Sequence, residues 1–460
     1  MKGYKKSLPV KAGVLILSLI IALCSCSIAD QSGGANITAS TLPQSHTQSA
    51  QSTVISSSSK PTTSAKKKPS STPQNTADKE LDFGLTSKKL SYVLPQNYYY
   101  AARLTGKNLT AYKTLKNALA TRTVGKISMG KISEKQLRLI YTAVRDDYPE
   151  YFWIPSHYSY STDNSGNITL IIEGDFDKEG YTVSAKERNE MAQKFKSVIA
   201  TIKSDLEKIA AKDGTTVYDF EEYILNWLCK NVEYTETDKT DLIYTAYGAL
   251  VNGKAVCEGY ARAASLMFNL VGIENGLVNG KGSDGVGHLW NIVKIGGSWY
   301  HFDPTWSDDE TLANDPYPFY YNLSDDEITR DRTINPDLKT DYSNVQDNFN
   351  FNLPKCTKSG RTYSSPNLLV LNQGDNYSNQ LVTALGNYLY ENNDNPKPFF
   401  DVIIEKDIAA QTATKIYKQI SFKQVVSTVN IKYLHLKNKK IKSYTVSAST
   451  NGAFRIYLTY

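Results

Sequence analysis

Three short stretches near the middle of the chain decide how it folds: Cys257-Glu258-Gly259-Tyr260, Gly287-His288-Leu289-Trp290-Asn291 and Trp299-Tyr300-His301-Phe302-Asp303-Pro304-Thr305-Trp306. Together they supply a Cys, a His and an Asp, in that order along the chain. A cysteine nucleophile needs a base that removes its proton and a third group that orients the base. The three stretches therefore predict cysteine chemistry, either acyl transfer or hydrolysis.

The segment after the Cys is predicted to be a helix. Residues 260–271 are rich in Ala and contain no Pro, and Gly272 suits a left-handed helix end. Gly253 supplies a turn just before the segment, so Cys257 falls in or near the first helical turn. At that position the unpaired N–H groups and the positive end of the helix dipole favour a thiolate over a thiol.

The His and the Asp belong to two β-prone runs separated by Gly296-Gly297, which is the signal for a hairpin. With a two-residue turn, Trp290 faces Asp303. Because side chains alternate across a strand, His288 then shares the face of Asp303, one diagonal step away. A four-residue loop keeps this arrangement, whereas a three-residue loop would break it.

Each of these residues also has a simpler interpretation. A lone Cys in an Ala-rich helix is most often a small buried apolar residue. A lone His on a strand is usually structural, and Asp-Pro is a common start of a turn. These separate interpretations do not explain why a Cys at a helix start accompanies a His and an Asp on one face of a hairpin. The combination therefore favours a catalytic site.

At these residues the chain resembles the bacterial secreted members of the transglutaminase-like superfamily. The resemblance implies Cys257 as nucleophile, His288 as base and Asp303 as orienting group. It also implies an α+β fold with a papain-like core, in which the nucleophile helix packs on an antiparallel sheet. Leu289 departs from the small residue, often Ala, that is expected there, and a strand tolerates either. The similarity covers roughly one seventh of the chain and rests on Tyr247-Gly248-Ala249-Leu250, Gly253-Lys254-Ala255-Val256-Cys257-Glu258-Gly259-Tyr260-Ala261, His288-Leu289-Trp290-Asn291 and Trp299-Tyr300-His301-Phe302-Asp303-Pro304-Thr305-Trp306.

The resemblance leaves the reaction open, because the superfamily includes cross-linking enzymes, proteases, amidases and inactive members. The active members would share an acyl-thioester step, in which Cys257 attacks a carbonyl and His288 protonates the leaving amine. An amine acceptor then gives transfer, and water gives hydrolysis. The backbone N–H of Cys257 is the first expected oxyanion donor, and Tyr244 or Tyr247 is a candidate for the second.

Three tryptophans of these motifs have two interpretations. Trp290, Trp299 and Trp306 could wall a substrate groove, but residues of this kind more often belong to the core. Trp290 and Tyr247 are therefore retained as candidate residues of the oxyanion site or substrate groove.

The amino terminus predicts an extracytoplasmic location. Four lysines precede the apolar run 14–23, which is a pattern typical of a signal peptide rather than of a membrane span. The run ends in Leu23-Cys24-Ser25-Cys26, which resembles a bacterial lipobox. On this interpretation residues 1–25 are removed and Cys26 carries the lipid, which anchors the protein to the outer face of the cell membrane or in the periplasm. The alternative is an ordinary cleaved signal peptide.

The rest of the chain is predicted to form a tether and three folded units. Residues 26–80 are rich in Ser, Thr and Pro and cannot bury enough apolar surface to fold. Residues 81–213 are expected to form an α+β domain, 214–350 the transglutaminase-like catalytic domain, and 360–460 an α+β accessory domain. In the last unit we expect a helix from Ser378, followed by strands at 399–404, 420–426, 431–436, 444–448 and 454–458.

Composition limits the possible partners and cofactors. The histidines are dispersed, and Cys-x-x-Cys and EF-hand motifs are absent from the sequence, so we expect neither a metal nor a cofactor. A net charge of +6 over 460 residues argues against nucleic acid as a partner. Cys229 and Cys356 could pair in an oxidising compartment, but Cys229 is more simply a buried thiol. We expect a monomer.

Two classes of function follow from these observations. The first is a surface-anchored cysteine enzyme that acts on amide bonds of proteins or of peptidoglycan peptides. The second is a catalytically silent surface protein for binding or adhesion that keeps the fold for its groove. The intact set of Cys, His and Asp favours the enzyme, because a silent site could lose any of the three.

Overall fold

A computed structural model of the protein describes residues 37–41, 99–120, 125–154, 157–172, 185–237, 240–308, 316–334, 353–358, 360, 366–372, 376–405, 415–416, 418–449 and 451–460. The predicted signal peptide and the predicted lipid-bearing Cys26 lie outside these residues. Within the described residues, helices that combine the length and the apolar character needed to cross a membrane are lacking.

The amino-terminal unit packs two helices against an antiparallel sheet with the strand order β1-β3-β4-β2. A capping box at Ser133 begins α2, as its sequence predicts. Within the predicted tether 26–80, residues Ile37–Thr41 form a strand that pairs with β3. The elements are β1 (Ile37–Thr41), η1 (Ala101–Arg103), α1 (Gly106–Ala120), β2 (Gly125–Gly130), α2 (Glu134–Asp147), β3 (His157–Thr162) and β4 (Ile168–Ile172).

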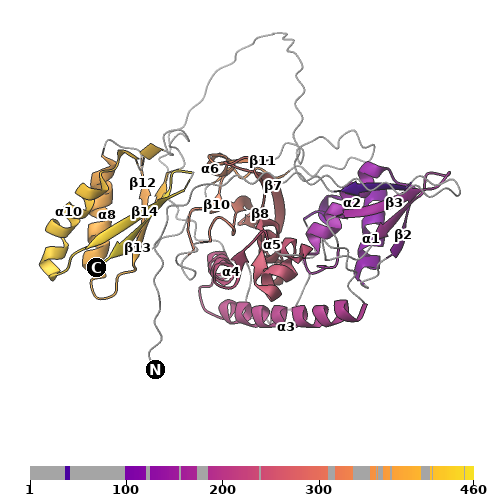
Figure 1. Cartoon of the computed structure of the whole chain (residues 1–460), viewed down its shortest axis with the longest axis horizontal. Coiled ribbons are helices and arrows are strands. Elements are labelled where there is room, and N and C mark those ends of the chain that lie inside the picture. The colour runs from indigo at the N-terminus through magenta and orange to yellow at the C-terminus, as the bar shows by residue number, and fades with distance from the viewer. Residues whose placement is uncertain are drawn as a thin grey trace, which may run out of the picture.

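The central unit surrounds a five-stranded sheet with the order β10-β9-β8-β7-β11, in which all neighbours are antiparallel. Helix α5 packs on β7 and β8, while α4 and the long α3 lie beyond it (Figure 1). The elements are α3 (Ala185–Ala210), α4 (Val217–Asn231), β5 (Glu233–Tyr234), η2 (Asp241–Tyr244), η3 (Gly248–Asn252), β6 (Lys254–Ala255), α5 (Cys257–Leu270), β7 (Asn275–Gly282), β8 (Gly287–Ile295), β9 (Ser298–Phe302), β10 (Tyr321–Leu323), α6 (Asp325–Ile328) and β11 (Arg332–Ile334).

Helix α5 has the boundaries that its sequence predicts. Cys257 is its first residue, and Gly272 follows its end with a φ of 73°. Gly259 is needed inside the helix, because a Cβ there would lie 2.4 Å from the carbonyl oxygen of Ile243 in η2. The absence of a side chain at Gly259 therefore lets the start of α5 approach η2 closely.

The β8–β9 hairpin also has the predicted register, with Ile295 opposite Ser298 across a two-residue turn. Both turn glycines have positive φ, 54° at Gly296 and 79° at Gly297, as this kind of tight turn requires. The strand ends of the hairpin therefore place the predicted His and Asp on one face.

The carboxyl-terminal unit is α+β, as predicted, but two of its elements differ from prediction. Residues 420–426 and 431–436 are expected to be strands and instead belong mainly to α10 and η5. Val425 and Val429 lie four residues apart, on one helical face, and both are buried in the core of this unit. The elements are β12 (Leu368–Leu371), α8 (Tyr377–Glu391), β13 (Phe399–Ile404), α10 (Phe422–Lys432), η5 (Leu434–Lys437), β14 (Ser443–Ala448) and β15 (Phe454–Thr459), with the strand order β12-β13-β15-β14.

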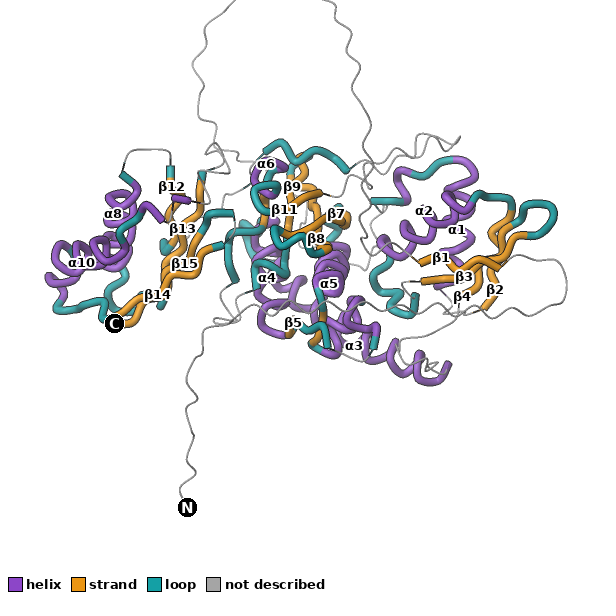
Figure 2. The backbone as a smooth tube through the Cα atoms, turned by 45° about the horizontal axis from the view of Figure 1, so that its top comes forward, coloured by secondary structure: helices purple, strands orange, loops and turns teal. Residues whose placement is uncertain are grey.

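Two hydrophobic cores hold these units together. One runs through the amino-terminal and central units and includes Ile403 and Ala453 of the carboxyl-terminal unit, and the other lies within the carboxyl-terminal unit. Helix α3, which the sequence assigns to the amino-terminal unit, packs against α4, α5 and η3. In the carboxyl-terminal unit, α8 and α10 cover one face of the sheet, and the other face is turned toward the central unit (Figure 2).

Candidate active site

The structure brings Cys257, His288 and Asp303 together. Cys257 is half-buried at the start of α5 and lies close enough to the imidazole of His288 to interact with it electrostatically. On the other side of the ring, His288 Nε2 lies 2.7 Å from Asp303 Oδ2. Because a carboxylate only accepts hydrogen bonds, Nε2 carries a proton and Nδ1 is left for the thiol.

The pair of His288 and Asp303 is deeply buried, with exposures of 7% and 0%. Burial disfavours the charged imidazole, but the charge and hydrogen bonds of Asp303 and Cys257 outweigh it and raise the pKa of His288 to about 9. Burial likewise opposes the charged form of Asp303, yet the cations of His288 and Arg332 bring the pKa of this carboxyl well below its usual range. At neutral pH the pair is therefore an imidazolium and a carboxylate.

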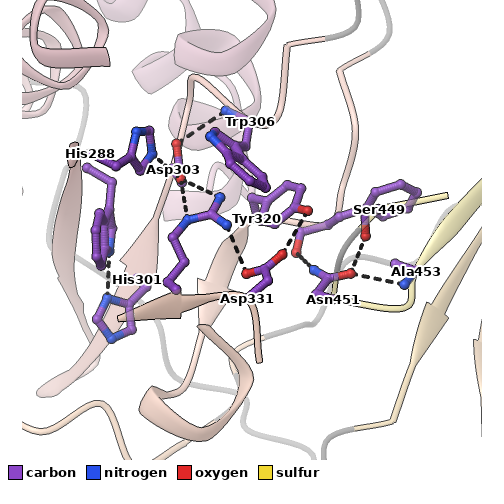
Figure 3. A network of polar contacts seen from close by, with 12 residues as sticks. His288, His301, Asp303, Trp306, Tyr320, Asp331, Ser449, Asn451 and Ala453 are labelled. Atoms are coloured by element: carbon purple, nitrogen blue, oxygen red, sulfur yellow. Dashed lines mark hydrogen bonds and ion pairs between the residues drawn. The ribbon is translucent and has the colours of Figure 1, made fainter. Parts of the chain in front are cut away.

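Arg332, which the sequence analysis missed, completes the surroundings of Asp303. Its Nε and one terminal nitrogen lie 3.1 and 2.8 Å from Asp303 Oδ2, the oxygen that also contacts His288. The backbone N–H of Trp306 donates to Asp303 Oδ1 at 3.2 Å. Arg332 enters from β11, 29 residues beyond Asp303, and no local pattern marks it. Figure 3 shows the contacts of Asp303 with His288 and Trp306.

Trp290 supports His288 from the side and does not line a groove. It is fully buried and its indole stacks on the imidazole of His288, with centroids 5.6 Å apart. Its Nε1–H donates to His301 Nδ1 at 3.0 Å (Figure 3). The groove prediction for Trp290 is therefore wrong, since tight packing leaves no ring face for a substrate.

A His, an Asp and a Cys lie together behind Trp290: the ligand atoms of His301, Asp325 and Cys356 are within 4.8 Å of one another. The indole N–H of Trp290 can only donate, so His301 Nδ1 must accept and Nε2 must carry the proton that faces Asp325 at 2.9 Å. This tautomer has no lone pair to offer a metal at Nε2. The cluster is a hydrogen-bonded support for Trp290 and does not fit a metal site.

The other predicted site residues have mixed outcomes. Tyr247 is 4% exposed, and its ring packs between Phe152 and Phe195, so it is not placed as an oxyanion donor. Trp299 packs against the core, whereas Trp306 lines an open cavity. Cys229 and Cys356 are free thiols in the structure, and Cys229 is buried, as the simpler prediction states.

A cavity of about 420 Å³ opens onto this site. His288 lies in its wall, together with Tyr234, which is close enough to Cys257 for the two to interact electrostatically. Partial burial and the charges of Cys257 and Glu236 raise the pKa of Tyr234, so its hydroxyl keeps its proton. The remaining lining residues come from the central unit and from the end of β14: Thr305, Trp306, Asp308, Tyr317, Phe319, Tyr320, Ser447, Ala448 and Ser449.

The start of α5 is also tied to the amino-terminal unit. Glu258 lies 2.7 Å from Arg145 of α2 and 3.0 Å from Arg262 on the next turn of α5. Arg262 in turn pairs with Asp146 of α2 at 2.8 Å. These largely buried ion pairs hold α5, the helix that begins at Cys257, against α2.

The central part of the chain matches the model of a known family. The model of the transglutaminase-like superfamily matches residues 206–304, which include the Cys, the His and the Asp. The chain carries a transglutaminase-like domain. The fold of this domain is α+β, as the sequence predicts, and the match begins within α3. The curated proteins contain no match to the chain.

Two solved structures are similar to part of this chain. One, from Cytophaga hutchinsonii, was named as a candidate cysteine protease and is 17% identical with a TM-score of 0.21. The similarity covers 32% of this chain and 52% of that one. The other, named as a TGase, is 18% identical with a TM-score of 0.21, and 32% of this chain and 43% of that chain are covered. The chain thus spans about half of the length of these two proteins.

Proposed function

We propose that the protein is a cysteine enzyme that cleaves amide bonds through an acyl-thioester on Cys257. The observation that supports this most directly is the position of His288, which is hydrogen-bonded to Asp303, lies within electrostatic reach of Cys257 and lines an open cavity. Each of the three side chains has a surrounding that suits the role that the sequence predicts for it.

The first step is acylation. The thiolate of Cys257 attacks the carbonyl carbon of the amide, and a C–S bond forms as the C–N bond breaks. The imidazolium of His288 gives its proton to the leaving amine. A pKa of about 9 keeps His288 protonated at neutral pH, so that this proton is available.

The second step releases the acyl group. Neutral His288 takes a proton from an amine or a water molecule, which attacks the thioester carbonyl and displaces the Cys257 thiolate. An amine acceptor gives cross-linking or transfer, and water gives a peptidase or amidase reaction. Asp303 accepts a hydrogen bond from Nε2–H throughout and so keeps Nδ1 turned toward the sulfur.

Two donors are available for the oxyanion of each tetrahedral intermediate. The first is the backbone N–H of Cys257, which belongs to the unpaired first turn of α5. The second is the hydroxyl of Tyr234, which lies in the cavity wall near Cys257 and now donates to Glu236 at 3.3 Å. Tyr234 replaces Tyr247 as a candidate for this role, beside Tyr244, which the sequence also suggests and which lies close enough to Tyr234 to affect its pKa.

We further propose that the enzyme works at the cell surface. The sequence upstream of the described residues supports a signal peptide and lipidation at Cys26, and its substrates would then be proteins or peptidoglycan peptides outside the cell. Growth of the source cells with a labelled fatty acid tests this, because label is expected in the parent protein and is expected to be lost in Cys26→Ser. Label retained by Cys26→Ser would contradict the anchor.

Alkylation of the purified protein without its predicted signal peptide and lipid anchor tests whether the Cys257 thiol is unusually reactive. Iodoacetamide is expected to modify Cys257 near pH 6 faster than an ordinary free thiol, and His288→Ala is expected to remove that advantage. Buried Cys229 serves as an internal control, since mass spectrometry of the digested protein reports each cysteine separately. If Cys257 reacts no faster than an ordinary thiol, the result contradicts the enzyme proposal and favours a binding protein without catalytic activity.

A peptide library with and without a primary amine separates the two reactions. Isopeptide or amine-labelled products indicate transfer, and shortened peptides indicate hydrolysis. Cys257→Ala is the control in both arms. Products that persist in Cys257→Ala, or their absence from every arm, would count against the proposed chemistry.

A further inference from the structure

The carboxyl-terminal sheet exposes one edge strand beside the candidate active site. β14 is the last strand in the order β12-β13-β15-β14, so its far edge has no strand partner among the described residues. Ser443, Thr445 and Ala448 are exposed, and Tyr444 and Val446 are partly exposed. An edge of this kind carries a row of backbone donors and acceptors.

The hydrogen-bond pattern shows which residues point to this edge. Ser449 N–H donates to Ala453 O, with the register in which Ser447 lies opposite Arg455. Because hydrogen-bonded and non-bonded pairs alternate in an antiparallel ladder, the odd-numbered residues of β14 bond to β15. The N–H and C=O groups of the even-numbered residues Tyr444, Val446 and Ala448 therefore point to the open edge.

The edge also lacks the features that usually prevent strand pairing. Exposed edges are commonly protected by charged residues, Pro or a β-bulge. The residues of β14 are Ser-Tyr-Thr-Val-Ser-Ala, with no charge and no Pro, and their register with β15 is continuous. This composition favours pairing with another extended chain.

The carboxyl end of β14 opens into the cavity that holds His288. Ser447, Ala448 and Ser449 form one wall of the cavity, and His288 lies in the same lining. A peptide paired with β14 would therefore enter the cavity at the end of the strand.

The hairpin is held in this position by several contacts with the central unit. Asn451, in the β14–β15 turn, donates to Phe319 O at 3.4 Å (Figure 3). The hydroxyls of Tyr317 and Tyr457 lie 2.7 Å apart, and Arg455 donates to Pro316 O at 3.1 Å. Tyr320, next to Phe319, donates to Asp331, which pairs with Arg332 at the site. The strand edge is thus positioned relative to Asp303 by a chain of direct contacts.

We propose that β14 binds the backbone of an extended peptide substrate as a fifth strand and guides it into the cavity toward Cys257. This inference rests on the proposed function for the reaction but not for the binding. An extended peptide is the occupant that matches an alternating row of donors and acceptors. Glycan chains and small amides do not offer this repeat. The substrate class is therefore an unfolded or extended protein segment.

Hydrogen exchange on the catalytically blocked Cys257→Ala protein tests the binding without any activity. The probe is reduced and carboxymethylated serum albumin, which is permanently unfolded. We expect it to slow exchange of the Tyr444, Val446 and Ala448 amides. Soluble peptidoglycan fragments are the comparison probe, and we expect them to leave these amides unchanged.

A proline variant tests the role of the edge in turnover. Val446→Pro removes an outward N–H, which an edge strand tolerates. The matched control is Val370→Pro on β12, the opposite edge of the same sheet. Asp401 N–H donates to Asn367 O and Glu405 N–H to Leu371 O, so Val370 also points outward. For the unfolded protein we expect KM to rise about tenfold in Val446→Pro and to stay within about twofold in Val370→Pro. The kcat for a single-residue amide should not change in Val370→Pro.

Three outcomes would overturn the proposal. The first is an absence of protection on β14, or equal protection by peptidoglycan fragments. The second is an equal change of KM in the two proline variants. The third is a dimer in sedimentation whose β14 amides are protected without any probe, because a second copy would then occupy the edge. If Val446→Pro does not fold, Ala448→Pro replaces it, and the exchange measurement decides in any case because it leaves β14 intact. Protection without turnover would show that the binding inference holds and the proposed reaction fails.

Discussion

His288 is held from three directions, and each contact has a different consequence. Asp303 accepts a hydrogen bond from Nε2, Cys257 interacts electrostatically with the ring, and the indole of Trp290 stacks on it. Arg332 shares the Asp303 oxygen that His288 uses, so the carboxylate stays ionised even though it is fully buried. The imidazole is therefore both fixed in direction and kept protonated.

Replacing Asp303 should change the pH profile of the enzyme. A raised His288 pKa of about 9 means that the protonated form persists below that pH and is lost as pH rises through it. Activity that needs His288 as an acid should therefore fall above about pH 9. In Asp303→Asn the alkaline limb of kcat/KM should move down toward the ordinary His value of about 6.5, and kcat should fall by roughly 10² to 10⁴.

Steady-state rates across the neutral and alkaline range measure this shift. Asp326→Asn, on the exposed surface of α6, is the matched control and should leave the limb in place. An alkaline limb that stays near pH 9 in Asp303→Asn would assign it to another group.

Helix α5 depends on α2 for its position. Arg145 and Asp146 at the end of α2 pair with Glu258 and Arg262 near the start of α5, and the Arg262 side chain is 5% exposed. Arg262 also donates to the carbonyl oxygen of Arg145 at 2.9 Å. The amino-terminal unit therefore acts as a support for the helix that presents Cys257.

Arg262→Met should break this support. It leaves the carboxylates of Asp146 and Glu258 with fewer partners in a largely buried place, which typically costs about 3–5 kcal/mol. Urea unfolding should show this loss in the free energy of unfolding. Arg138→Met removes an exposed pair with Glu134 on the same helix and should change the free energy by about 0–1 kcal/mol. Similar losses in the two variants would argue against a special role of the buried pairs.

The two hydrophobic cores divide the chain differently from its three α+β units. The amino-terminal and central units share one core, so neither should unfold without the other. The carboxyl-terminal unit has its own core between its sheet and the helices α8 and α10. It is joined to the central unit by polar contacts around Tyr317 and Arg455 and by Ile403 and Ala453, which are buried in the larger core.

Calorimetry should therefore resolve two unfolding transitions. Leu385→Ala leaves a cavity in the carboxyl-terminal core, where Leu385 is fully buried. We expect it to reduce the free energy of unfolding of the carboxyl-terminal unit by about 2–5 kcal/mol and so to lower the temperature of one transition. Leu266 is fully buried in the larger core, and Leu266→Ala should lower the temperature of the other transition. A single transition that moves in both variants would show that the units unfold as one.

Local patterns in the sequence predict much of this fold. The Ala-rich run with Gly272, the two-glycine turn and the Ser133 capping box each predict an element that the structure contains. Such signals work because they depend on residues within a few positions of one another. Residues 420–436 fail for the same reason: β-branched residues suggest strands locally, while packing on the sheet selects a helix.

The sequence by itself determined the helix that begins at Cys257 and the hairpin that carries His288 and Asp303, because both follow from short-range turn and periodicity signals. Only the tertiary structure decided that Arg332 forms an ion pair with Asp303, that Trp290 is buried against His288, that Tyr247 belongs to the core and that β14 borders the cavity. These four depend on contacts between segments that are distant along the chain. The free energy of such contacts comes from packing and burial of the assembled units, which no short stretch of sequence contains.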